Sequence, residues 1–249
     1  DVLPSTATGL AVAIADKLDS LVGIFGINQP PTGSKDPFGL RRAAIGLLRI
    51  IIEKELTLDI TVLSQQAVNA YGSKLSNANT VNEVFEFLLG RYRAMYEEQN
   101  IGVDVIQAVQ TLKPTQPLDF DRRIKAVANF RNLAEAEALA AANKRVANIL
   151  SKDGVKVTGG FDSSLLVEAA EIALATEVTK LQNELLPLFH AGDYTPALTA
   201  LAALRAPIDS FFDTVMVNAD DLAIRQNRLN LLASLRALFL AVADISQLQ

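Results

Sequence analysis

Apolar side chains recur every three or four residues along most of this chain, and this spacing limits its fold more than any other feature. The first such run consists of Leu10, Ile14, Leu18, Leu21, Val22 and Phe25, which fall on one face of a helix. Similar runs return over residues 40–51, 81–95, 139–149, 174–188 and 222–239. No segment alternates apolar and polar residues as a strand does, and Val155-Lys156-Val157 is too short to build a sheet. The sequence therefore predicts an all-α fold of two helical bundles.

The starts of several helices have capping signals. Asp36 followed by Pro37 predicts an N-cap and a first helical residue. Two further starts are predicted by capping boxes, in which a polar N-cap residue precedes a glutamate by three positions: Thr80 with Glu83, and Asn132 with Glu135.

Residue counts exclude several kinds of active site. The chain has no cysteine and one histidine, His190, so it can form neither a thiolate site nor a histidine-based metal cluster. Gly33-Ser34-Lys35 lacks the glycine spacing of a phosphate-binding loop, because position 28 is Asn and a serine precedes the lysine. We expect no catalytic residue and no metal site, and we expect His190 to lie at a helix end or on the surface.

Charge is unevenly distributed on the two sides of a predicted domain boundary. Pro114 and Pro117 interrupt the helical pattern, which predicts one domain over residues 1–113 and a second over 114–249. The net charge of the chain is −5, yet residues 119–156 carry 8 basic and 5 acidic side chains. A local basic face can bind phosphate even on an acidic protein.

The basic stretch predicts an RNA-binding surface on two consecutive helices. Its candidate residues, chosen as cations for phosphates, an amide for a base edge and an aromatic ring for stacking, are Arg122, Arg123, Lys125, Phe130, Arg131, Lys144, Arg145 and Asn148. Lys144 and Asn148 are four residues apart and share a helix face. The alternative is an ordinary solvated helix surface with ion pairs, and the pattern alone leaves both open.

Two smaller groups of cations are further candidates. In the last long helix, Arg225 and Arg228 lie beside a predicted core face formed by Leu222, Leu229, Leu232, Leu235 and Phe239. Neutralising nearby acids would explain these two arginines equally well. Lys35, Arg41 and Arg42 surround a helix start and form a possible second contact surface, unless an Asp36–arginine pair explains them.

Several of these segments resemble one known family, the β subunit of bacterial heterotetrameric glycyl-tRNA synthetase. The resemblance runs in order along the chain and includes ADKLD at 15–19, GIFGI at 23–27, KDPFGLRRAA at 35–44, the basic stretch 119–150, FFD at 211–213, VMV at 215–217, Arg225 with NRL at 227–229, and VADIS at 242–246. The KDPF-x-LRRAA and AAANKRV motifs are its most specific parts. Because the chain starts at Asp1 without a methionine or a signal pattern, we expect a C-terminal piece of such a subunit.

The resemblance implies a fold and a role for each part. Residues 114–249 correspond to a DALR-like helical anticodon-binding domain, and 1–113 to the end of an HD-type domain with a helical linker region. Asp16 matches a metal-ligand aspartate of HD hydrolases, but the histidines that complete such a site are missing, so no metal is expected.

The resemblance also implies a function and partners. The chain would bind glycine tRNA, whose anticodons end in two cytosines, and orient it for the α subunit of a cytoplasmic α2β2 ligase. ATP and Mg²⁺ would bind at the α subunit, so this part alone would be non-catalytic and would need no cofactor. The alternative is a helical protein-interaction or assembly domain without direct RNA contact.

Overall fold

The computed structural model describes residues 2–152, 156–157 and 159–248, so Asp1 and Val155 of the interpretations above lie outside it. Within these residues the chain is helical, and its only β-type pairing is an isolated bridge between Thr32 and Lys35. The predicted all-α class is therefore confirmed. The chain divides into two compact units, Asp1–Ile106 with Lys113–Asp121 and Gln107–Leu112 with Arg122–Gln249.

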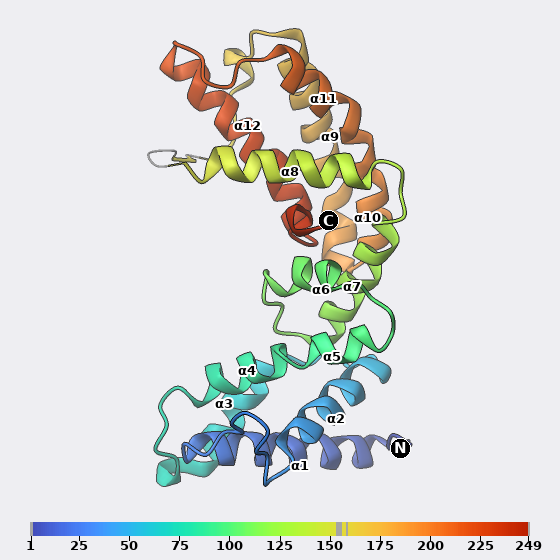
Figure 1. Ribbon diagram of the computed structural model, residues 1–249, viewed down its shortest axis with the longest axis vertical. Helices are drawn as coiled ribbons and strands as arrows, with labels where there is room; N and C mark the ends of the chain where they lie inside the picture. The colour runs from blue at the N-terminus through green and yellow to red at the C-terminus, as the bar shows by residue number, and fades with distance from the viewer. Residues whose placement is uncertain (1, 153–155, 158, 249) are drawn as a thin grey trace. The chain divides into compact units, whose positions relative to one another are not determined.

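The first unit is built around α1, which packs against α2, α3 and α4 (Figure 1). Its elements are α1 (Ala7–Gly26), α2 (Leu40–Glu53), α3 (Ile60–Tyr71), the 3-10 turn η1 (Gly72–Lys74), α4 (Thr80–Leu89) and α5 (Tyr92–Glu97). The apolar face predicted for α2 is completely buried and consists of Leu40, Ala44, Leu47, Leu48 and Ile51. Its burial against α1 removes these apolar side chains from water, which stabilises the unit.

Two helices, α6 (Val103–Gln110) and α7 (Pro117–Phe130), begin in the first unit and end in the second. At the start of α7, the ring of Phe120 stacks on Tyr92 with centroids 3.7 Å apart, and the hydroxyl of Tyr96 donates to Asp121 at 2.9 Å. Burial and the nearby Asp121 carboxylate raise the pKa of both tyrosines above their usual range, so both stay neutral.

The second unit is a bundle in which α8 crosses α12 (Figure 1). Its remaining elements are α8 (Ala136–Leu150), η2 (Ser163–Leu165), α9 (Ala169–Ala191), α10 (Tyr194–Leu201), η3 (Ala202–Leu204), α11 (Arg205–Thr214), α12 (Leu222–Leu240) and η4 (Ile245–Gln247). Helix α9 packs against α10, α11 and α12, and α8 packs against α12 and η4. The inner side of α8 is buried through Leu139, Ala140 and Val146.

Several predicted helix starts are wrong in detail. Helix α2 begins at Leu40 rather than Pro37, because Gly39 takes a left-handed conformation (φ 65°) that turns the chain first. Asp36 still caps the helix across this turn, since its carboxylate accepts from the N–H groups of Leu40 and Arg41, both at 2.9 Å. The capping boxes at Thr80 and Asn132 do not form. A capping box is present instead at the start of α9, between Glu168 and Glu171.

Candidate nucleic-acid interface

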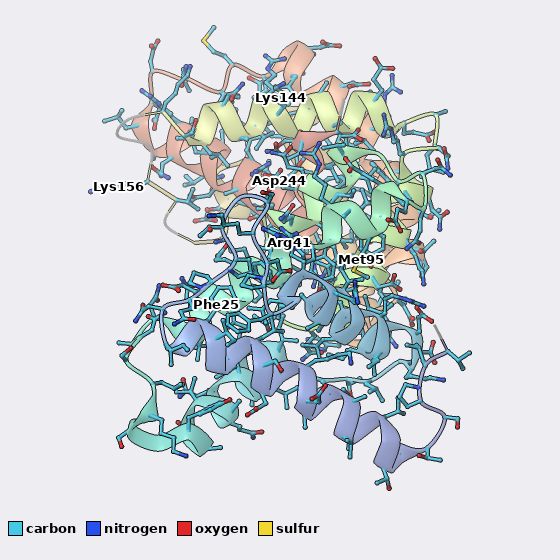
Figure 2. The ribbon with its side chains drawn as sticks, turned by 60° about the horizontal axis from the view of Figure 1, so that its bottom comes forward. Phe25, Arg41, Met95, Lys144, Lys156 and Asp244 are labelled. Atoms are coloured by element: carbon cyan, nitrogen blue, oxygen red, sulfur yellow. The ribbon has the colours of Figure 1, made fainter. Side chains whose placement is uncertain are left out.

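The outward face of α8 carries a row of polar side chains. Lys144, Arg145 and Asn148 are all exposed on it, as is Glu137 two turns earlier (Figure 2 labels Lys144). The opposite face of the same helix is buried, so the amphipathic pattern fixes which residues point outward. Neither Lys144 nor the Asn148 side chain forms a hydrogen bond or ion pair with the described residues. This row, residues 137–148 on the exposed side of α8, is called the α8 face below.

Arg145 has its own support within the α8 face. Its guanidinium carbon lies 4.0 Å from the ring centroid of Phe212, a half-buried residue of α11. This cation–π contact holds the planar guanidinium against the ring while the charge remains exposed to solvent. Arginine held in this way can bind a phosphate or stack under a base.

A pocket of about 590 Å³ opens beside Lys144. Its lining has three charged residues, Arg131, Glu137 and Lys144. Its apolar lining residues are Ala136, Ala140, Ala141 and Leu248. Three small alanines leave room over the helix, and three charged side chains contribute to the lining. The pocket thus combines an apolar floor with groups that can hydrogen-bond, as small-ligand sites do.

The candidate residues in and just after the second-unit part of α7 lie partly on the surface and partly in the core. Arg122, Lys125 and Arg131, just after the helix, are exposed. Arg123 is half-buried and donates to the carbonyls of Ala241 and Val242 and to the Tyr194 hydroxyl, each at 2.8 Å. Phe130 is 2% exposed. Both Arg123 and Phe130 therefore hold the bundle together, and neither presents its polar head or ring to a ligand.

The two candidate arginines of α12 also differ in their surroundings. Arg225 is exposed, whereas Arg228 is 5% exposed and forms a bidentate ion pair with Glu171 at 2.6 and 3.1 Å. Arg228 also donates to the Met216 carbonyl at 2.6 Å. Burial raises the pKa of Glu171, but hydrogen bonds from Arg228 and from the backbone of Glu168 and Val167 outweigh it and lower the pKa overall. The sequence left two roles open for Arg228, an RNA contact and the neutralisation of a nearby acid. The geometry favours the second role, with Glu171 as the acid.

The core face predicted for α12 needs one correction. Leu229, Leu232, Leu235 and Phe239 are buried as expected, but Leu222 is 75% exposed. Leu222 is the first residue of the helix, directly after the N-cap Asp221, and lies beyond the part of α12 that the bundle covers.

In the first unit, Lys35, Arg41 and Arg42 lie at the turn before α2. The Arg41 guanidinium donates to the Gly33 carbonyl at 2.6 Å and lies 4.0 Å from the Asp36 carboxylate. This contact fits the ion-pair explanation for Arg41. Lys35 and Arg42 are exposed and form no side-chain pair among the described residues.

Asp16 and His190 are the two residues considered above for metal binding or catalysis. Asp16 and His190 are both exposed on their helices, as expected for His190. Within the described residues, no group of three or more His, Cys, Asp or Glu side chains could hold a metal ion. In that same part of the chain, no helix is both long and apolar enough to cross a membrane.

Sequence reasoning missed three residues around the α8 face. Glu137 could have been found, since it lies seven residues before Lys144 and so on the same side of a helix. Phe212 and Leu248 come from other elements, and only the fold brings them to α8.

Comparison with known proteins matches two family models to separate parts of the chain. A family model described as glycyl-tRNA synthetase beta subunit matches residues 1–111, and one described as DALR anticodon binding domain matches residues 139–245. The glycine–tRNA ligase β subunits of Pseudoalteromonas translucida, Aeromonas hydrophila and Klebsiella pneumoniae are 58%, 59% and 58% identical over all 249 residues. The chain spans 36% of the length of each of these relatives. It therefore belongs to the glycyl-tRNA synthetase β-subunit family and carries a DALR anticodon-binding domain.

Proposed function

We propose that this chain is a tRNA-binding part of a glycine–tRNA ligase that recognises glycine tRNA in the anticodon region. The observation that carries the proposal is the α8 face, where Lys144, Arg145 and Asn148 are exposed together inside the matched anticodon-binding segment. Exposed cations bind phosphates, and an exposed amide can both donate to and accept from a base edge.

The proposed mechanism is positional. Contacts to the anticodon region would orient the tRNA so that its acceptor end reaches the site of aminoacylation on the α subunit of an α2β2 assembly. ATP and Mg²⁺ would bind at that α subunit, and this chain alone would be non-catalytic. The working compartment would be the cytoplasm.

The contact surface proposed here is narrower than the set of candidate residues in the sequence. It comprises Arg122, Lys144, Arg145 and Asn148, with Lys125, Arg131 and Arg225 as exposed neighbours in sequence or fold. Arg123, Phe130 and Arg228 are left out because their functional groups are held inside the bundle. Lys35 and Arg42, with Arg41, remain a possible second surface in the first unit.

The test is a filter-binding assay of the 249-residue chain with glycine tRNA and with the same tRNA carrying substituted anticodon cytosines. We expect tighter binding to the unsubstituted tRNA and a fall in affinity with rising salt. Lys144→Ala with Arg145→Ala should weaken binding about tenfold or more, because two phosphate contacts are lost. Lys54→Ala, at an exposed lysine of the first unit, is the matched control and should have no effect.

Other outcomes would change the conclusion. Equal affinity for both tRNAs would remove anticodon recognition, and binding that does not depend on salt would remove phosphate contact. If the chain bound no tRNA but still bound the α subunit, the assembly role without RNA contact would replace the proposal.

A further inference from the structure

The pocket beside Lys144 has charged groups of opposite sign at its two ends. Glu137 and Lys144 both line it and are seven residues apart on α8, which corresponds to about 10.5 Å along a helix axis. Ala140 and Ala141 lie between them and form an apolar floor one helix turn from each end. The side chains of Glu137 and Lys144 are long enough to extend over this floor, so one edge of a planar ring lying there would meet an acceptor and a donor together.

Glu137 is available to such a ligand. Its side chain is exposed and has neither a hydrogen bond nor an ion pair within the part of the chain that the structure describes. A carboxylate on an otherwise cationic surface weakens phosphate binding, so a purely electrostatic RNA surface gains nothing from it. Its place in the lining of the pocket instead suits a specific hydrogen bond.

The four bases differ in what they present to this pair. Cytosine and adenine have an amino donor next to a ring-nitrogen acceptor, which matches a carboxylate followed by an ammonium group. Uracil has no amino group, and its one ring N–H lies between two carbonyl oxygens, so pairing this N–H with Glu137 brings a carbonyl oxygen next to the carboxylate. The repulsion between the carbonyl oxygen and the carboxylate, together with the missing amino group, disfavours uracil relative to cytosine and adenine.

We propose that the pocket lined by Glu137, Ala140, Ala141 and Lys144 binds one unstacked base bearing an amino group, with Glu137 accepting from that amino group. Lys144 donates to the neighbouring ring nitrogen or carbonyl of the base. Leu248 packs against the ring from the side of η4. This inference rests on the proposed RNA-binding function and assigns Glu137 as its specificity-determining residue.

The test compares short single-stranded RNAs of one base type, binding to the 249-residue chain at low salt. Fluorescently labelled oligocytidine and oligouridine of equal length carry the same phosphate charge and differ in the base edge. We expect oligocytidine to bind roughly tenfold more tightly, within the range for one paired base contact. Oligoadenosine should also bind more tightly than oligouridine.

The decisive variant is Glu137→Gln. Its amide can rotate to donate to the uracil carbonyl, so the preference for cytosine should fall to about twofold or less while overall affinity stays the same or rises. A Glu137 that acts only by its charge would shift both affinities equally and leave the preference intact, which would overturn the assignment. Glu184→Gln, an exposed acid of α9, is the matched control and should keep the full preference.

Failure of the two proposals can be told apart. If the unaltered chain binds none of the oligonucleotides and no tRNA, the RNA-binding function itself is wrong. If it binds oligocytidine and oligouridine with equal, salt-dependent affinity, RNA binding holds and only the base pocket is wrong.

Discussion

Arginine residues in this chain have different roles, which depend on what their guanidinium groups contact. Arg228 and Arg225 are three positions apart on α12, yet one is buried on Glu171 and the other is exposed. Arg123 and Arg122 are adjacent on α7 and show the same contrast. A list of basic residues therefore overstates a binding surface, since some cations are there to satisfy buried carboxylates and carbonyls.

Removing Arg228 should destabilise the second unit far more than removing Arg225. Arg228→Ala leaves the Glu171 carboxylate buried without its guanidinium partner, which costs about 3–5 kcal/mol. Arg225→Ala removes an exposed side chain and should change stability by less than about 0.5 kcal/mol. Urea denaturation followed by circular dichroism measures both, and equal losses would contradict the structural role of Arg228.

The same ion pair predicts a dependence of stability on pH. Because the folded-state pKa of Glu171 lies below its usual value of 4.5, the charged form stabilises the fold above that pH. This contribution is lost as the pH falls from about 4.5 through the folded-state pKa. The urea concentration at the unfolding midpoint, measured at pH 6, 5, 4 and 3, should decrease as the pH falls below about 4.5. The decrease should be smaller in Glu171→Gln than in the unaltered chain. Glu184→Gln, at an exposed site, should fall as steeply as the unaltered chain.

At the scale of elements, the sequence predicted where helices lie better than where they begin. The faces of α1, α2 and α9 follow from spacing, because burial of apolar side chains repeats with the helix period. The helix predicted over 81–95 is divided into α4 and α5 near Gly90, where the chain turns before Tyr92 reaches the core. Helix starts depend on local turns such as the left-handed Gly39, which spacing does not reveal.

The start of α2 offers a direct test of its observed cap. Asp36→Ala removes the acceptor for two backbone N–H groups and should cost about 1 kcal/mol, even though three residues separate Asp36 from the helix. Asp36→Asn keeps an acceptor and should lose less. Thermal unfolding of the two variants checks this, and an unchanged melting temperature in Asp36→Ala would show that the cap contributes nothing.

The α8 face shows the same limit for a site. Lys144, Arg145 and Asn148 could be predicted together, because all three lie on one helix and their spacing sets their direction. The contact of Arg145 with Phe212 and the place of Leu248 beside Lys144 in the pocket lining could not be predicted in this way. Phe212 lies 67 residues after Arg145, and Leu248 lies 104 residues after Lys144. Long-range contacts of this kind follow from tertiary packing rather than from local pattern.

At the scale of the whole molecule, the net charge is negative although one stretch of the sequence is basic. The chain has a net charge of −5, and residues 157–249 carry 5 basic and 11 acidic side chains. The basic stretch 119–156 is therefore surrounded in sequence by acidic segments. An anionic ligand is attracted more strongly by this stretch than by the acidic segments, which favours this stretch as the place where the proposed RNA ligand binds.

The number of phosphate contacts can be measured from salt dependence. If Arg122, Lys144 and Arg145 each contact one phosphate, the logarithm of the tRNA association constant should fall with the logarithm of salt concentration with a slope of about −2 to −3. Each arginine or lysine changed to alanine should reduce that slope by about 0.7–0.9. Arg123→Ala should destabilise the fold instead, and a slope that stays unchanged in Lys144→Ala would remove that contact.

The contact between Arg145 and Phe212 has a consequence for conformational entropy. A free arginine side chain loses up to about 2 kcal/mol of rotational freedom when a ligand fixes it. Arg145 is already restricted by the ring 4.0 Å away, so part of that loss occurs when the protein folds. Binding RNA through Arg145 should therefore cost less entropy than binding through the unrestrained Lys144, and the two cations of the α8 face differ in rigidity although they carry the same charge.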